Sequence, residues 1–240
     1  IHGQYQVNLR VTDNNFCVND TTDTITVWPR PTANFSTNTV CFEDTTAHTD
    51  LSNITSPLGA SINSWTWSFG GGGSSSLQSP NWSYPNHGIF STQLIVEDTN
   101  ACRDSIQLNV QVDTLPIAQF TADTVCFGSA TSFTDQSLAF GSVLSLWTWD
   151  FGNTNSSNQQ NPTELYSSAG LYQVRLTVSD GNSCSDDTLK TVVVDSLPIV
   201  SFSYSNVCLG DTASFINASF GRSAGVQSWK WFFGDGDSGV

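Results

Sequence analysis

Hydrophobic and polar residues alternate along most of the chain with the two-residue period of a β-strand that has one buried and one wet face. The clearest case is the segment 172–178, in which Tyr172, Val174, Leu176 and Val178 alternate with polar residues, and we predict a closing hairpin of 171–180 with 185–194. Turn formers such as those at 153–157 and 180–183 separate these segments. No stretch of the sequence has a helical period with caps, so the pattern predicts an all-β protein.

A Trp-x-Trp-x-Phe-Gly phrase occurs three times, at 65–70, 147–152 and 229–234, and its copies begin 82 residues apart. A Pro-x-x-x-Phe phrase recurs at 31–35, 116–120 and 198–202, in steps of 85 and 82 residues, and predicts the first strand of each unit, an edge strand from the proline to the phenylalanine. A catalytic constellation is normally built once, so this regular repetition indicates architecture. Units of about 83 residues made of short alternating strands predict small antiparallel β-sandwiches in tandem.

The aromatic residues of each repeated phrase fall on one side of a strand. Burying one tryptophan removes about 150–250 Å² from water, which stabilises by about 4–6 kcal/mol before entropy is subtracted. We therefore predict that these residues form the core of each sandwich, and a ligand-binding surface is the alternative interpretation. The predicted core residues are Trp65, Trp67, Phe69, Trp147, Trp149, Phe151, Trp229, Trp231 and Phe233.

The phase of the repeats divides the chain into two complete units and parts of two others. The predicted divisions are 1–28 (the last hairpin of a unit), 29–113, 114–195, and 196–240 (the first part of a unit). We expect a window onto a continuous array of further copies in the same chain. The alternative is a homopolymer in which the hairpin at 1–27 of one chain completes the unfinished unit of the next chain by strand addition.

Composition and charge narrow the classes of function. The 240 residues carry a net charge of −14, which repels nucleic acid and anionic lipid. A hydrophobic share of 38% is sufficient for packed cores. No apolar run approaches the roughly 18 residues of a membrane helix. We expect a folded protein that neither binds nucleic acid nor inserts into a membrane.

The second unit resembles the PKD (polycystic kidney disease) domain. Its Trp-x-Trp-Asp-Phe-Gly strand at 147–152, the tyrosine at 166 and the Gly-x-Tyr-x-Val strand from 170 are similar to motifs of that family. The resemblance covers nearly the whole chain as successive copies, and it implies immunoglobulin-like sandwiches arranged as beads in a rod. The copies depart from the pattern at 71–73 and 153–155, where Gly-Gly-Gly and Asn-Thr-Asn replace Asp-Gly, and at His48, where the other copies have Phe133 and Phe215.

Six cysteines recur at two fixed positions of the unit: Cys41, Cys126 and Cys208 at the first, and Cys17, Cys102 and Cys184 at the second. They lack Cys-x-x-Cys spacing, so zinc is not expected, and their fixed phase indicates an oxidising compartment.

Pairing within a unit would join turns that lie roughly 20–26 Å apart in an immunoglobulin-like topology, whereas a disulfide needs Cα atoms within about 7 Å. We predict that Cys41 bonds Cys184 across a domain junction and that the other four pair beyond this window. An unusually short first strand would leave pairing within a unit open.

The placement of the cysteines is also similar to PKD arrays of very long surface proteins that gliding-type bacteria export by the type IX route. That resemblance implies an extracellular, cell-surface location and an adhesive or stalk-like role without catalysis. Tripeptides of the Asp-Thr-Leu type, as at 113–115, resemble an O-glycan acceptor. The chain is thus interpreted as the structural or adhesive region of a secreted surface protein or filament whose partners are further repeats, surface glycans or neighbouring cells. The alternative is a carbohydrate-contacting spacer of a secreted chitinase or protease.

Three other features have both a structural and a functional interpretation. Recurrent aspartates such as Asp180 and Asp186 follow strands, where they cap turns, and with Glu43 and Asp44 they offer oxygens for a Ca²⁺ ion at a junction. Trp82 is either packing or a sugar-stacking residue. At 48 the histidine is interpreted as an interior residue and not as a base. Apart from this Ca²⁺ hypothesis, no cofactor, metal or catalytic residue is predicted.

Overall fold

The fold is taken from a computed structural model that describes residues 2–55, 59–222 and 225–239. Ile1 and Val240, which bound the predicted partial units, lie outside the described residues. The described residues form strands, bridges, turns and bends without a helix, which confirms the all-β prediction. Consequently none of them belongs to a helix long and apolar enough to cross a membrane. The chain divides into two compact units, 1–115 and 116–240.

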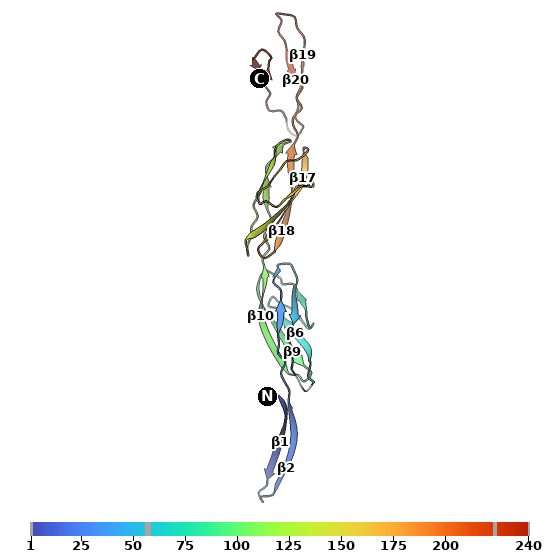
Figure 1. Cartoon of the computed structure of the whole chain (residues 1–240), viewed down its shortest axis with the longest axis vertical. Coiled ribbons are helices and arrows are strands. Elements are labelled where there is room, and N and C mark those ends of the chain that lie inside the picture. The colour runs from blue at the N-terminus through green and yellow to red at the C-terminus, as the bar shows by residue number, and fades with distance from the viewer. Residues whose placement is uncertain (1, 56–58, 223–224, 240) are drawn as a thin grey trace. The chain divides into compact units, whose positions relative to one another are not determined.

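The first complete domain is a sandwich of two sheets. The larger sheet has the order β4-β10-β9-β6-β7 and the smaller one the order β3-β5-β8. Strand β4 runs parallel to β10, and the other pairs are antiparallel. The long strands β9 and β10 lie beside each other in Figure 1. The strands are β3 (Phe35–Thr37), β4 (Val40–Cys41), β5 (Thr46–Asp50), β6 (Ile62–Ser68), β7 (Ser74–Ser75), β8 (Asn81–Trp82), β9 (Gly88–Asp98) and β10 (Arg103–Asp113).

The second complete domain repeats this topology, with the sheet orders β12-β18-β17-β14-β15 and β11-β13-β16. Its closing hairpin, β17 and β18, matches the predicted hairpin to within one residue at each end. The strands are β11 (Phe120–Ala122), β12 (Val125–Cys126), β13 (Thr131–Asp135), β14 (Leu144–Asp150), β15 (Ser156–Ser157), β16 (Thr163–Glu164), β17 (Gly170–Asp180) and β18 (Ser185–Asp195).

Two further segments have the strands of partial domains. The first is a hairpin of β1 (Gly3–Thr12) and β2 (Val18–Val27), and the other contains β19 (Phe202–Tyr204), β20 (Phe215–Asn217), β21 (Trp231–Phe232) and β22 (Ser238–Gly239). The hairpin exposes its apolar face: Val7 is 48% exposed, whereas its counterpart Val174 in β17 is fully buried at 0%. These segments therefore keep the local pattern of the repeat without a packed core.

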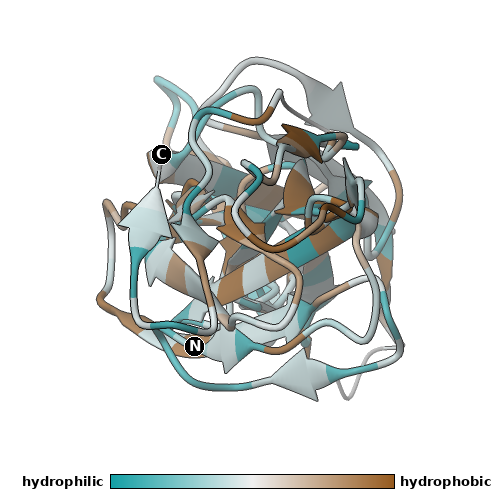
Figure 2. Ribbon diagram, turned by 90° about the horizontal axis from the view of Figure 1, so that it is seen from above, coloured by the Kyte–Doolittle hydropathy of each residue, from teal (hydrophilic) through white to brown (hydrophobic). Residues whose placement is uncertain are grey.

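Each complete domain buries the alternating side chains of its two sheets against one another. In the second domain Trp149, Phe151, Leu176 and Val178 belong to one buried cluster. Bands of hydrophobic residues alternate with hydrophilic ones along the strands in Figure 2. The alternation that predicted the strands thus also produces the core, because successive side chains of a strand point to opposite faces.

In the two complete domains, the glycine that ends the phrase is required by close contact between neighbouring strands. A Cβ at Gly70 would lie 2.5 Å from the backbone nitrogen of Ser91 in β9. At Gly152, where φ is +71°, a Cβ would lie 2.5 Å from the carbonyl oxygen of Gln173. Any side chain at these positions would force the strands apart.

The predicted first strand of the unit, from the proline to the phenylalanine, was placed too early. In the second domain β11 starts at Phe120, and Ile117 forms only an isolated bridge with Leu138. The ladder is interrupted because the amide of Gln119 donates to Oγ of Ser137, at 3.1 Å, instead of to a backbone carbonyl oxygen of the neighbouring segment.

Candidate functional site

An aspartate anchors the cysteine in the closing hairpin of each complete domain. Oδ1 of Asp180 accepts hydrogen bonds from the amides of Asn182, at 3.0 Å, and of Cys184, at 2.9 Å. Between these two residues Ser183 has a left-handed backbone, with φ of 68°. The first domain has the same arrangement around Asp98 and Cys102. Asp98 and Asp180 therefore cap turns, as predicted for the recurrent aspartates, and each turn fixes the backbone of a cysteine. Asp186, for which the same role was predicted, instead binds the amide of Ala118.

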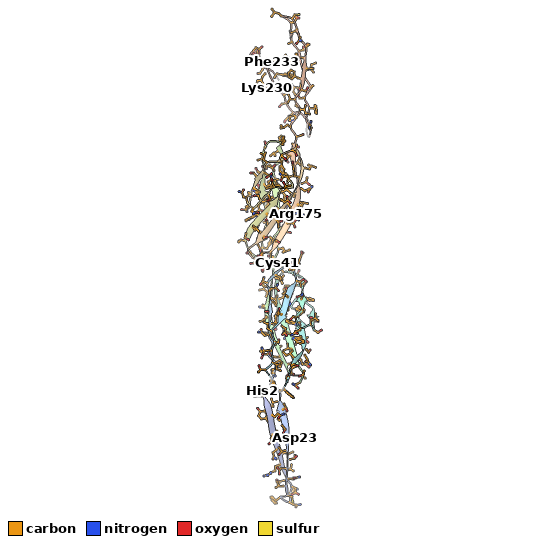
Figure 3. All side chains as sticks on the ribbon, turned by 45° about the vertical axis from the view of Figure 1, so that its right-hand side comes forward. His2, Asp23, Cys41, Arg175, Lys230 and Phe233 are labelled. Carbon is orange, nitrogen blue, oxygen red and sulfur yellow. The ribbon has the colours of Figure 1, made fainter. Side chains whose placement is uncertain are left out.

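The two cysteine positions lie at opposite ends of a domain. Cys41 pairs with Asp113, the last residue of β10, so it lies where the chain leaves the first domain. Figure 3 labels Cys41 at an end of that sandwich. In the second domain, Cys184 is two residues from Asp186, whose carboxylate binds the amide of Ala118 where the chain enters the domain. Strands that run the length of the sandwich separate the two positions.

The three copies of each cysteine position differ in oxidation state. Cys41 and Cys184 are each disulfide-bonded. Cys17, Cys102, Cys126 and Cys208 carry free thiols, and of these Cys102 is partly buried and the others are exposed. One cysteine of each positional class is therefore oxidised.

In both complete domains, a carboxylate that sequence reasoning missed binds the first tryptophan of the phrase, here called the outer tryptophan, from the opposite sheet. In the second domain Oδ2 of Asp135 accepts from Nε1 of Trp147, at 2.8 Å, and from Nε2 of Gln160, at 3.0 Å. Its Oδ1 accepts from the amide of Ser137, at 2.9 Å. Burial opposes ionisation, but the hydrogen bonds from Ser137, Gln160 and Trp147 outweigh it and hold the pKa of Asp135 below its ordinary value.

The first domain has the same carboxylate cluster, formed by Asp50, Trp65 and Gln78. Hydrogen bonds again outweigh burial and lower the pKa of Asp50. The third copy has Asn217 at the corresponding position, and its Oδ1 accepts from the amide of Ser219. The sequence signal for this cluster is an aspartate that keeps a constant distance from the phenylalanine of the Pro-x-x-x-Phe phrase in two copies, Phe35 to Asp50 and Phe120 to Asp135.

The inner tryptophans occupy the core as predicted, but the outer ones do not. Trp67 and Trp149 are fully buried, and Nε1 of each donates to a backbone carbonyl oxygen at 2.9 Å. Trp65 and Trp147 pack against the core and are only partly buried, because their Nε1 atoms reach the carboxylate clusters near the surface.

Within the predicted core, Phe69 and Phe151 are buried. The third copy departs from the prediction. Trp229 is 51% exposed, and Trp231 and Phe233 are only partly buried. In the complete domains the corresponding side chains are covered by a closing hairpin, and the described residues from 202 to 239 include no equivalent of β17 and β18.

Trp82 is a packing residue and not an open platform. Its ring stacks on Phe69 with centroids 4.7 Å apart and planes 7° apart, and a Cβ at Gly73 would lie 2.2 Å from the ring. The second domain has Glu164 in place of this tryptophan, and the carboxylate accepts from the side-chain amides of Asn153 and Asn155. The two departures from the family motif are thus coupled: glycines accompany the indole, and asparagines accompany the carboxylate.

Each recurrent aspartate considered for calcium uses one carboxylate oxygen in the fold of its domain. Asp98 and Asp180 bind turn amides, while Asp104 and Asp186 bind the amides of Ala33 and Ala118. Among residues 2–55, 59–222 and 225–239, no group of three histidine, cysteine, aspartate or glutamate side chains is placed to hold a metal ion.

Comparison with known proteins gives consistent matches to one family. Residues 28–112 and 113–194 each match the PKD domain. The chain is 33% identical over 99 residues to Pre-pro-metalloprotease PrtV of Vibrio cholerae, covering 40% of the chain and 10% of that protein. It is 37% identical over 75 residues to Microbial collagenase of Vibrio alginolyticus, covering 31% of the chain and 9% of that protein. The chain thus spans about a tenth of the length of these relatives.

Solved structures give matches of the same kind. The PKD1 domain of Vibrio anguillarum Epp is 30% identical, with a TM-score of 0.34, and the match covers 35% of this chain and 99% of that one. The PKD1 domain of the Vibrio cholerae metalloprotease PrtV is 32% identical, with a TM-score of 0.32, and the match covers 34% and 98%. With two successive matches that span most of its length, the chain belongs to the PKD domain family.

Proposed function

We propose that this chain is a non-catalytic structural and adhesive repeat region of a secreted bacterial cell-surface protein or extracellular filament, in which PKD domains in tandem form a stiff stalk. The observation that carries the proposal is the placement and oxidation of the two cysteine classes. Cys41 lies where the chain leaves one domain, Cys184 lies where it enters the next, and each is disulfide-bonded. A bond between them would restrain rotation and bending at the junction.

The repeat extends this proposal to the other cysteines. Cys126 and Cys208 occupy the position of Cys41, while Cys17 and Cys102 occupy that of Cys184. We propose that these four form the same bond with further PKD copies. Disulfides persist in oxidising surroundings, which supports a location outside the cytoplasm.

The chemistry of the domain surfaces supports a mechanical role. Most large aromatic side chains of the complete domains pack in or against the cores, and the recurrent aspartates bind turns and tryptophan clusters. Such domains offer length, shape and stability, while adhesion would depend on their polar surface and on the glycans proposed for it. Because fold alone is weak support for any activity, the test addresses the junction directly.

The first experiment is peptide mapping of the native, non-reduced protein. We expect a peptide that links Cys41 to Cys184, and recovery of Cys126 linked to Cys184 would contradict the proposal. A second measurement compares the distance distribution between probes placed in the two domains. It should broaden in Cys41→Ser and stay unchanged in the control Cys208→Ser. An equally narrow distribution in Cys41→Ser would show that the bond does not stiffen the junction.

A second function is favoured by the relatives. Metalloprotease PrtV and the microbial collagenase contain segments similar to these domains. We propose as the alternative that the domains are spacers of a secreted enzyme that contact its polymeric substrate. Retention of the chain on insoluble chitin or collagen fibres, and its loss in a variant of an exposed aromatic residue such as Phe140→Ala with the fold intact, would favour this alternative. Absence of retention would favour the stalk.

A further inference from the structure

The core of the first complete domain contains a hydrogen-bonded chain of three polar side chains. Nε2 of His48 lies 3.2 Å from the hydroxyl of Tyr84, which lies 2.6 Å from Oγ1 of Thr92. The exposed fractions of these residues are 1%, 5% and 0%. His48 is in β5 and Thr92 in β9, so the chain of hydrogen bonds connects the two sheets.

The second domain has an apolar version of the same site. Phe133 stands in place of His48 and Val174 in place of Thr92, and both are buried. The amides of His48 and Phe133 both donate, at 3.0 Å, to the carbonyl oxygen of a proline that precedes the neighbouring strand of the sheet, β8 or β16. The tyrosine at 166 keeps its place and donates to the carbonyl oxygen of Phe151. The backbone around the site is therefore shared, and only the chemistry of two side chains differs.

The surroundings of His48 disfavour its charged form. Its ring contacts Phe35 of β3, Trp67 of β6, Phe69 and Tyr84, with centroids 5.0–6.3 Å apart. Of these neighbours only Tyr84 titrates, and burial raises its pKa.

Nδ1 of His48 is buried without a hydrogen-bond partner. An imidazolium needs acceptors for both N–H groups, and this site provides none at Nδ1. Burial lowers the pKa of His48, and the backbone at Thr46 and Pro80 opposes that shift only in part. On the same strand, the carboxylate of Asp50 is occupied by Trp65 and Gln78.

We propose that the His48–Tyr84–Thr92 chain makes the first PKD domain an acid-responsive element of the array. The first domain opens more often as the surroundings become mildly acidic, while the opening of the second domain does not increase in this way. The physical cause is proton uptake on opening. In the folded domain His48 is buried in its neutral form. Once the strands separate, the ring is exposed to water and takes up a proton. Opening is therefore favoured as pH falls below about 6.5, the ordinary pKa of histidine.

The test is peptide-resolved hydrogen exchange of the full chain at pH 7.5 and pH 5.5, corrected for the intrinsic exchange rate at each pH. One proton taken up below pH 6.5 raises the opening equilibrium about tenfold between these values. We expect this increase, relative to the second domain, for the peptides of β5, β6 and β9. In His48→Phe, which copies the second domain, the difference between the domains should disappear. An equal pH response of both domains in the native chain, or a persistent difference in His48→Phe, would overturn the proposal.

A titration of the native chain provides a test that does not depend on a folded variant. The NMR chemical shifts of the His48 ring should remain those of a neutral imidazole at pH 5.5. Titration of His48 near pH 6.5 within the folded domain would overturn the proposal, even if His48→Phe failed to fold. The double substitution Phe133→His with Val174→Thr should transfer the acid response to the second domain.

Discussion

Replacing Asp135 with asparagine tests the carboxylate cluster that holds the outer tryptophan. The asparagine oxygen keeps the bond from Ser137, but the amide nitrogen takes the place of Oδ2 and faces the donors of Trp147 and Gln160. Two hydrogen bonds to a charged acceptor are lost, each contributing about 1.5–3 kcal/mol when buried. Because Asp135 is partly exposed, water compensates for part of the loss. We expect the second domain to lose about 2 kcal/mol of unfolding free energy at neutral pH.

The assay is hydrogen exchange of the full chain, read separately for peptides of the two domains. A loss of 2 kcal/mol corresponds to about a thirty-fold increase in the opening of β13 and β14, and exchange in the first domain should be unchanged. The control is Asp187→Asn, which removes an exposed ion pair, 3.2 Å long, with Arg175 of β17, a residue labelled in Figure 3. This substitution should cost less than about 0.5 kcal/mol. If Asp135→Asn were no more destabilising than this control, the reasoning about the cluster would be refuted.

Three other outcomes follow from the structure. Glu43 has a left-handed backbone, with φ of 77°, at a turn where both later copies have glycine, so Glu43→Gly should raise the melting temperature of the first domain, by up to about 1 kcal/mol in stability. Gly73→Ala should lower the stability of the first domain by about 2 kcal/mol or more, because the new methyl group collides with the ring of Trp82. The double variant with Trp82→Ala should recover part of that loss. Asp50 and Asp135 have lowered pKa values, so both domains should keep this stabilisation above about pH 4 and lose it as pH falls through the folded-state pKa, as urea unfolding at several pH values would show.

The strands and the repeat could be read from the sequence because their signals are local. Alternation from Tyr172 to Val178 placed β17 almost to the residue, and the turn residues after Asp180 placed the start of β18. The start of β11 could not be read in this way. It depends on Ser137, which is 18 residues away from Gln119 in the chain and whose hydroxyl takes the amide of Gln119 out of the ladder.

The candidate sites also divide into those formed by residues near in sequence and those formed by residues of facing sheets. The aspartate that caps each cysteine turn was predictable, because its partners lie within four residues. Nothing in the sequence distinguished Trp149 as fully buried from Trp147 as partly buried, since two residues that share one face of a strand have the same pattern. The difference arises from the facing sheet, which covers Trp149 with Phe120 and Phe133 and supplies Asp135 to Trp147.

The sequence by itself determined that the chain is a row of repeated β-sandwiches, because periodicity, glycines and turn residues act between neighbours in the chain. Only the tertiary structure decided which polar side chains are enclosed. His48 and Thr92 lie 44 residues apart, and their connection through Tyr84 exists only once the two sheets face each other. Burial is a property of the packed sheets, and the pKa values and hydrogen-bond demands of these side chains follow from it.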